Sequence, residues 1–188
     1  GLTDDHIFEQ VIPLRYWGQK FAVTTAEYNT SYNIARVTAI YNDTEVKVNG
    51  RKVKTLKEFE TYEHKVMGGS AWIETSRPTI CYQYLTSAGR NQLYIKDDGT
   101  EITFGDPSMV YIAPIEQGLD EIHVSAFTIK DPDPKAEAAR EALTSMQHYV
   151  NVVTKTTAVS AMTINGEPIP DSIPFSLLQG NTEYSYVK

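Results

Sequence analysis

The sequence predicts an all-β protein made of two sandwich-like antiparallel units from a duplicated plan, with one inserted α-helix at about residues 134–148. Up to residue 117, short alternating apolar runs are separated by turn residues, a pattern typical of a sandwich or a barrel. Asn-Gly pairs at residues 49–50 and 165–166 mark hairpins. Apolar residues at helical spacing occur near residues 136–150, after Asp133 as N-cap and Pro134 at the first helical position.

The first part of the chain reads as strands joined by tight turns. Its strands are expected at residues 20–25, 34–41, 44–48, 51–55, 59–66, 71–75, 79–85, 93–95 and 101–104. Gly50 completes a type I′ turn, and Ser76-Arg77-Pro78 is expected to separate two strands. The spacing of these runs predicts an antiparallel arrangement of neighbouring strands.

The stretch Gly105–Gln117 divides the chain. Gly105-Asp106-Pro107 is a turn signal. The residues after it are apolar on both faces, which predicts a strand buried on both sides or passing between two packed units. We therefore expect residues 1–117 to form the first β-sandwich unit, and residues 118–188 a second, apparently incomplete β unit that carries the helix.

The second part repeats some features of the first. Further strands are expected at residues 122–129, 149–155, 158–164, 167–169 and 183–187. Glu9-Gln10 corresponds to Glu116-Gln117, and Thr44–Gly50 corresponds to Ser160–Gly166, which indicates a duplication. The second part stops before the last strands of the first would recur. This predicts a fragment of a longer protein or, alternatively, a second unit whose strands pair with the first.

Charge and composition argue against several partners. The net charge is −7 without a Lys/Arg cluster, so neither nucleic acid nor an anionic membrane is expected as the main partner. No apolar run approaches the roughly 18 residues of a membrane-spanning helix, so no membrane insertion of this segment is expected. Cys81 is the single cysteine, and its strand setting without a neighbouring base predicts a buried, unreactive thiol.

No catalytic residue, metal site or cofactor is predicted. The four histidines lack metal-ligand spacing, and Asp97-Asp98-Gly99 and Asp131-Pro132-Asp133 lack the ligand pattern of a calcium loop. Neither Ser76 nor Ser108 lies in a Gly-x-Ser-x-Gly setting. A glycosidase pair of carboxylates contributed by separate strands stays open as an alternative, because sequence spacing does not reveal such a pair.

The predicted binding site is the loop at residues 26–33, with Tyr28, Asn29 and Tyr32 as its candidate residues. Tyrosines beside small polar residues suit recognition of a protein or a sugar. A plain solvent-exposed loop is the alternative. The helix at 134–148 is a second candidate, either packed on the sandwich or presented to a partner.

Several segments in order resemble the N-terminal domain family of IgGFc-binding protein: Trp17–Phe21, Asn49-Gly50, Ile73–Pro78, Gly105–Met109, Pro114–Gln117, His148–Val153 and Ile164–Gly166. Bacterial members of that family look like large secreted or surface-attached proteins, which implies adhesion. Fc binding is not carried over, because no residue here matches an Fc-contact motif. The expected structural residues are Trp17, Gly50, Asp106, Pro107, Glu116, Gln117 and Gly166.

Together these observations predict a non-catalytic, secreted or cell-surface, adhesion-type binding module with a protein or glycan ligand. One alternative is a carbohydrate-binding accessory domain of a surface polysaccharide system. The other is a structural spacer within a larger surface protein.

Overall fold

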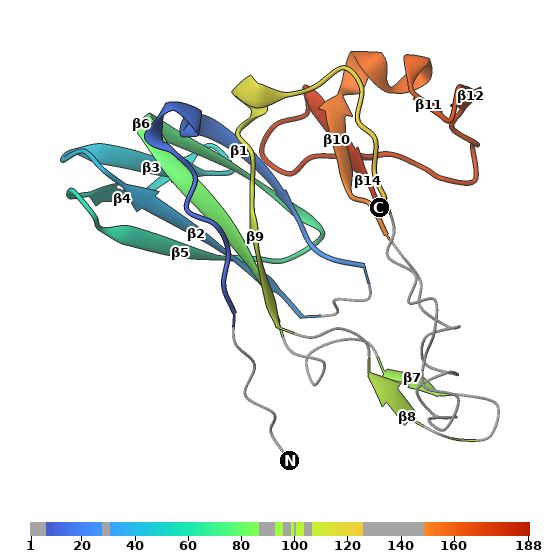
Figure 1. The fold of residues 1–188 in the computed structure, drawn as a ribbon, viewed down its shortest axis with the longest axis horizontal. Coiled ribbons are helices and arrows are strands. Elements are labelled where there is room, and N and C mark those ends of the chain that lie inside the picture. The colour runs from blue at the N-terminus through green and yellow to red at the C-terminus, as the bar shows by residue number, and fades with distance from the viewer. Residues whose placement is uncertain are drawn as a thin grey trace. The chain divides into compact units, whose positions relative to one another are not determined.

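The computed structural model describes residues 7–27, 31–86, 93–95, 99, 101–103, 107–125 and 149–188. Within these ranges the protein is predominantly β, and every strand pair is antiparallel, as predicted (Figure 1). The chain divides into two compact units, residues 1–118 with 151–188 and residues 119–150. The domain boundary after residue 117 and the duplication behind it stay predictions.

In the described part of the first unit, seven strands form one sheet around a long central strand. Their bounds are β1 Gly18–Thr24, β2 Asn33–Ala39, β3 Thr44–Val48, β4 Arg51–Leu56, β5 Thr61–Val66, β6 Ser70–Leu85 and β9 Ser108–Tyr111. The first half of β6 pairs with β1 and β3, and its second half pairs with β2 and β9. One group of strands thus pairs with the first half of β6 and another group with its second half. The strand β6 therefore joins the two groups that enclose the core.

The core consists of the inward residues of these strands. Its buried cluster contains Phe21, Val23, Ala35, Val37, Ala39, Val46, Val48, Leu56, Val66, Ala71, Ile73 and Cys81. Alternation within each half of β6 places Ala71, Ile73 and Cys81 in this core and turns residues 72, 74, 82 and 84 to the other side. The outer residues Trp72, Glu74, Tyr82 and Tyr84 are therefore available for other contacts.

The C-terminal segment belongs to the same unit and contacts the outer side of the first half of β6. It contains β10 Val152–Lys155, β13 Ser176–Leu177 and β14 Tyr184–Val187 in one small sheet, and the hairpin β11 Thr163–Ile164 with β12 Glu167–Pro168. Tyr184 stacks on Trp72 with ring centroids 5.3 Å apart, and Leu178 is fully buried. A further hairpin pairs β7 Leu93–Ile95 with β8 Glu101–Thr103, as predicted.

Among the described residues, the other regular elements are short 3₁₀ turns: η1 Leu14–Tyr16, η3 Ile115–Gln117 and η4 Thr156–Ala161. The predicted helix at 134–148 lies outside the described residues. The strand predicted at 158–164 is wrong for its first part, where η4 replaces it. The predicted strand at 122–129 is absent from residues 122–125, the portion that the structure describes.

Two predictions around β6 need correction. Ser76-Arg77-Pro78 does not separate two strands, because β6 continues through these three exposed residues. The missing N–H of Pro78 is tolerated here, since the β1 ladder shifts register between Gly18 and Lys20 at the same place. Residues 107–117, the described part of the stretch 105–117, are also not buried on both faces: Val110 in β9 is exposed, and among the described strands β9 pairs only with β6.

Candidate functional site

The predicted binding loop is only partly described. Tyr28 and Asn29 lie outside the described residues, so their role stays a prediction. Tyr32 is half-buried, and the ammonium group of Lys65 lies 4.6 Å from the centre of its ring. The backbone carbonyl of Tyr32 accepts a hydrogen bond of 3.1 Å from the Thr86 hydroxyl, so this residue is anchored to the sheet.

The structure brings together several of the residues predicted to be structural. Gln117 donates a side-chain hydrogen bond to the carbonyl of Tyr16, and Glu116 Oε1 accepts one of 3.3 Å from the backbone N–H of Gln19. The Trp17 indole donates to the carbonyl of Ile12 at 2.9 Å. Residues 116–117 are thus hydrogen-bonded to residues 16–19, about 100 positions earlier in the chain.

The other predicted structural residues lie in turns. Gly50 and Gly166 have φ of +79° and +85° and follow Asn49 and Asn165, which also have positive φ. Both Asn-Gly pairs therefore form the two-residue hairpins that their sequence predicts. Pro107 is half-buried just before β9, and Asp106 lies outside the described residues.

The second half of β6 carries a row of tyrosines on its outer side. Tyr82 lies directly between Arg36 of β2 and Tyr111 of β9, and Tyr84 is the next outward residue of β6. The rings of Tyr82 and Tyr111 meet edge to face at 6.0 Å. We call the surface formed by Arg36, Tyr82, Tyr84 and Tyr111 the tyrosine face; all four side chains are half-buried.

Arg36 organises the tyrosine face. Its guanidinium group lies 4.6 Å from the centre of the Tyr84 ring and donates a hydrogen bond of 3.0 Å to the Tyr84 hydroxyl. The same group forms an ion pair with Glu63, which accepts from Arg36 Nε at 2.9 Å. The hydrogen bond to Glu63 raises the pKa of Arg36, so the guanidinium group that lies over the Tyr84 ring stays charged.

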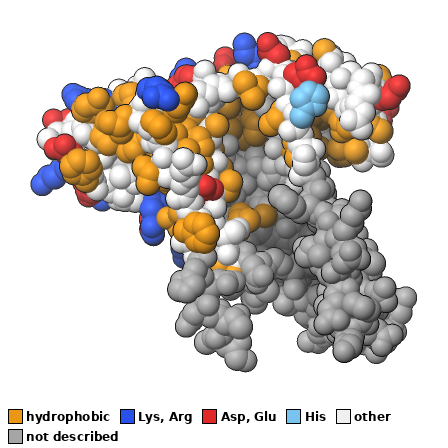
Figure 2. Space-filling model, in the orientation of Figure 1, with side chains coloured by type: hydrophobic (Ala, Val, Ile, Leu, Met, Phe, Trp, Pro, Cys, Tyr) orange, Lys and Arg blue, Asp and Glu red, His pale blue; other side chains and the backbone are white. Residues whose placement is uncertain are grey.

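The segment before β1 borders the tyrosine face. The Tyr82 hydroxyl donates to the carbonyl of Gln10 at 3.0 Å, and the Tyr111 hydroxyl donates to that of Tyr16 at 3.0 Å. Burial raises the pKa of both phenols, so they stay protonated and act as donors. Phe8 and Val11, which flank Gln10 in this segment, are 87% and 79% exposed. Hydrophobic side chains are spread over the described part of the face shown in Figure 2.

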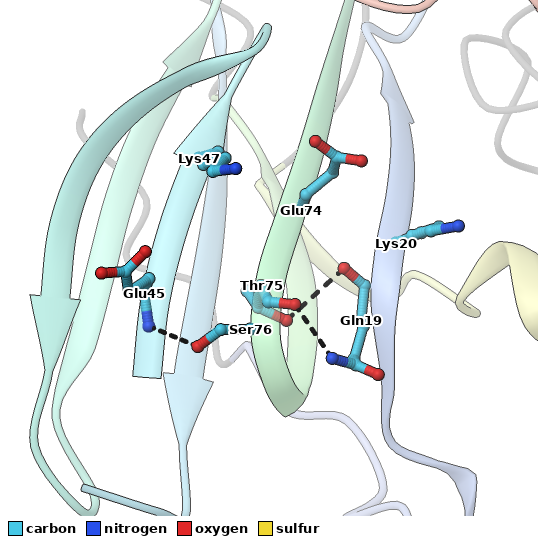
Figure 3. A pocket seen from close by; sticks show the side chains of 7 residues that line it. All are labelled: Gln19, Lys20, Glu45, Lys47, Glu74, Thr75 and Ser76. Carbon is cyan, nitrogen blue, oxygen red and sulfur yellow. Dashed lines mark hydrogen bonds between the residues drawn. The ribbon is translucent and has the colours of Figure 1, made fainter. Parts of the chain in front are cut away.

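A polar hollow of about 230 Å³ lies on the outer side of β1, β3 and the first half of β6 (Figure 3). It is lined by Gln19, Lys20, Glu45, Lys47, Glu74, Thr75 and Ser76. Glu74 of β6 lies between Lys20 of β1 and Lys47 of β3, which are its direct neighbours in the two ladders. We call this feature the charged hollow.

The described residues show no arrangement for metal binding, since they contain no group of three or more His, Cys, Asp or Glu side chains that could hold an ion. Cys81 is fully buried, which confirms the predicted burial of this thiol, and burial raises its pKa to about 12. Of the helices described, none has the length and apolar character needed to cross a membrane.

The sequence from residue 2 to residue 188 matches a protein family described as IgGFc binding protein. The chain belongs to this family. The resemblance inferred from Trp17–Phe21 and the later segments is therefore confirmed over almost the whole length. No curated protein and no solved structure gives a significant match to the chain.

Within this member of the IgGFc binding protein family, sequence reasoning missed both the tyrosine face and the charged hollow. Alternation in the predicted strands placed Tyr82 and Tyr84 on one side of residues 79–85, but it gave no strand order. Arg36 and Tyr111 come from strands distant in sequence, and only the observed register places them beside Tyr82. Paired register is set by tertiary packing, so a single sequence carries little signal for such a surface.

Proposed function

We propose that this chain is a non-catalytic, adhesion-type module that binds a protein through the tyrosine face, as part of a secreted or cell-surface protein. The observation that carries the proposal is the placement of Arg36, Tyr82, Tyr84 and Tyr111 side by side on one outer sheet surface. Tyrosine and arginine are the residue types enriched in protein interfaces and in their energetic hot spots. Membership of a family named for binding a protein supports the same class of function.

The chemistry of the face suits a protein ligand. The tyrosine rings and the exposed Phe8 and Val11 offer apolar area, while Arg36 and Glu63 offer charged groups that fix the orientation of a partner. The rings are already positioned by the Tyr82–Tyr111 contact and by the Arg36–Tyr84 contact. Side chains held in place before binding lose less conformational entropy when a partner docks.

Surface plasmon resonance with the immobilised chain tests this proposal. The probes are an IgG Fc fragment, a secreted mucin, fibronectin and collagen. We expect at least one of them to bind, and the double variant Arg36→Ala/Tyr84→Ala to weaken that binding about 30-fold, which corresponds to about 2 kcal/mol. Lys155→Ala, which changes an exposed lysine of β10, is the matched control and should bind as the wild type does.

Two results would contradict the proposal. One is binding that the double variant leaves unchanged although its urea unfolding midpoint equals that of the control. The other is the absence of binding to every protein on the panel. Selective binding to a glycan array would then favour a carbohydrate-binding accessory domain. The absence of binding to both the protein panel and the glycan array would favour a structural spacer.

A further inference from the structure

We propose that the charged hollow is a second binding site, separate from the tyrosine face, and that it binds an acidic sugar unit, one that carries a carboxylate and several hydroxyl groups. The site goes beyond the proposed protein-binding function, because none of its lining residues belongs to the tyrosine face. It lies beside the first half of β6, whereas the tyrosine face lies on the second half.

The first step of the argument is that three charges in the hollow are unengaged. Lys20 and Lys47 lie directly opposite Glu74, the position at which opposite charges on neighbouring strands normally attract each other. Within the described residues, neither lysine forms an ion pair with Glu74 or with any other acid. Their ammonium groups and the carboxylate are therefore free to contact a ligand.

The second step is the sign of the charge. Glu45 is paired with Lys52, and the hydrogen bond and charge of Lys52, with the charge of Lys47, lower the pKa of Glu45. Because Lys52 from outside the lining engages Glu45, Lys20 and Lys47 face one unpaired carboxylate in the hollow, that of Glu74. An anionic group is attracted to the two lysines, while Glu74 accepts hydrogen bonds from hydroxyl groups next to it.

The third step concerns the polar side chains of Gln19 and Ser76 in the hollow. Hydrogen bonds within the protein hold them in place and use only part of their hydrogen-bonding capacity. The register shift between Gly18 and Lys20 leaves Gln19 outside the regular ladder, and a bulge of this kind redirects a side chain. Gln19 Nε2 donates to the carbonyl of Thr75 at 3.1 Å, which leaves its Oε1 as an acceptor (Figure 3). Ser76 Oγ accepts from the N–H of Glu45 at 2.9 Å and keeps its own proton to donate.

These groups select against simpler ligands. A small inorganic anion would meet Glu74 without offering it a hydrogen-bond donor, and a cation would meet Lys20 and Lys47. A neutral sugar would leave both ammonium groups without an anionic partner. A sugar with a carboxylate and hydroxyl groups matches the lysines, Glu74, Gln19 and Ser76 together.

The test is a titration of the ¹⁵N-labelled chain, followed by NMR, with sodium glucuronate, glucose or sodium sulfate at equal ionic strength. We expect saturable shifts of the Gln19, Lys20 and Glu74 amides with glucuronate, and at least about tenfold weaker binding of glucose and sulfate. Lys20→Gln/Lys47→Gln should weaken glucuronate binding at least tenfold, while Lys155→Gln should not. Glu74→Gln should bring the affinities for sulfate and glucuronate closer together.

Equal binding of glucose or of sulfate, shifts confined to other residues, or no saturable shift at all would each overturn the acidic-sugar proposal. A lysine variant that binds glucuronate like the wild type would overturn it as well. The substituted side chains are on the surface, so an unchanged amide spectrum outside the hollow verifies the fold of each variant. Because Arg36 and Tyr84 are unchanged in these variants, failure here leaves the protein-binding test unaffected.

Discussion

The two halves of β6 carry aromatic side chains on the same outer side, but these aromatics have different surroundings. Trp72 in the first half is 3% exposed, because Tyr184 of the C-terminal segment stacks on it. Tyr82 and Tyr84 in the second half are only half-buried and face Arg36. An aromatic residue on an outer strand face therefore stabilises the fold where the chain itself covers it, and is available to a partner where the chain does not.

The covered half is held by a set of specific contacts. The N–H of Trp72 donates to the side chain of Asn49 at 2.9 Å, and the side chain of Gln179 donates to the carbonyl of Gly68 at 2.8 Å. Asn151 donates to the hydroxyl of Thr24 at 2.8 Å. The Trp72 contact joins β6 to the hairpin of β3 and β4, and the Gln179 and Asn151 contacts link the sheet to the C-terminal segment. We therefore expect substitutions in the first half of β6 to change stability and substitutions in the second half to change binding.

The largest effect is expected for Trp72→Ala. It removes a buried indole and its stack with Tyr184, so it should reduce the free energy of unfolding by about 3–5 kcal/mol. Tyr84→Ala on the other half should cost about 1 kcal/mol or less, since that side chain is half-exposed. Urea unfolding of both variants measures this difference in the free energy of unfolding. Equal losses in the two variants would contradict the proposed difference between the two halves of β6.

A smaller loss is expected for Gly180→Ala in the C-terminal segment. Gly180 has φ of +81°, and a Cβ added there would lie 2.4 Å from the Cα of Asn49. Backbone strain and this collision should together cost about 2–3 kcal/mol. Gly166→Ala is the matched control, since φ is +85° and nothing lies within 4 Å, so only about 1 kcal/mol should be lost. Equal losses in urea unfolding would show that the Asn49 contact is absent.

Arg36→Ala should separate binding from stability. The Arg36–Glu63 pair is exposed, with 41% and 51% of the two side chains accessible, so its removal should lower the free energy of unfolding by only about 0.2–1 kcal/mol. The loss of protein-binding free energy caused by Arg36→Ala should exceed this loss of stability, because the guanidinium group also orders Tyr84. A larger loss of stability than of binding free energy would make Arg36 a structural residue.

The smallest effect concerns His64 of β5, the strand that pairs with β2, which itself pairs with the second half of β6. Burial lowers the pKa of His64, so the folded state favours the neutral ring. The stability present above the unfolded pKa of about 6.5 is therefore lost as the pH falls below that value toward the folded pKa. Between pH 7.5 and pH 5, His64→Gln should lose less stability than the wild type in urea unfolding. Identical pH slopes would contradict this assignment.

Local signals were sufficient to predict most strands. Val46 and Val48 alternate with Glu45 and Lys47 before Asn49-Gly50, and this run became β3 with its hairpin. The prediction failed at Ser76-Arg77-Pro78, where a register shift in the partner strand β1 lets β6 continue. It also failed at Val110, because an apolar run does not reveal whether a second strand covers it.

The candidate surfaces were harder to predict, since each depends on which strands are neighbours. Lys20, Lys47 and Glu74 are separated by more than 25 residues from one another in sequence, and the pairing of β1 and β3 with β6 brings them together. Likewise, the tyrosine alternation in residues 79–85 showed that Tyr82 and Tyr84 share a side, but not that the C-terminal segment covers Trp72 instead. Those long-range contacts decide which outer face stays open.

Hydroxyl-radical footprinting of the chain, alone and with the protein that binds it in the panel experiment, tests the central claim most directly. In the free chain, Tyr82, Tyr84 and Tyr111 should be modified and Trp72 should be spared, because only Trp72 is covered by the chain itself. In the complex, the three tyrosines should become protected while the labelling of Trp72 stays unchanged. Protection elsewhere, with undiminished labelling of the tyrosine face, would contradict the account.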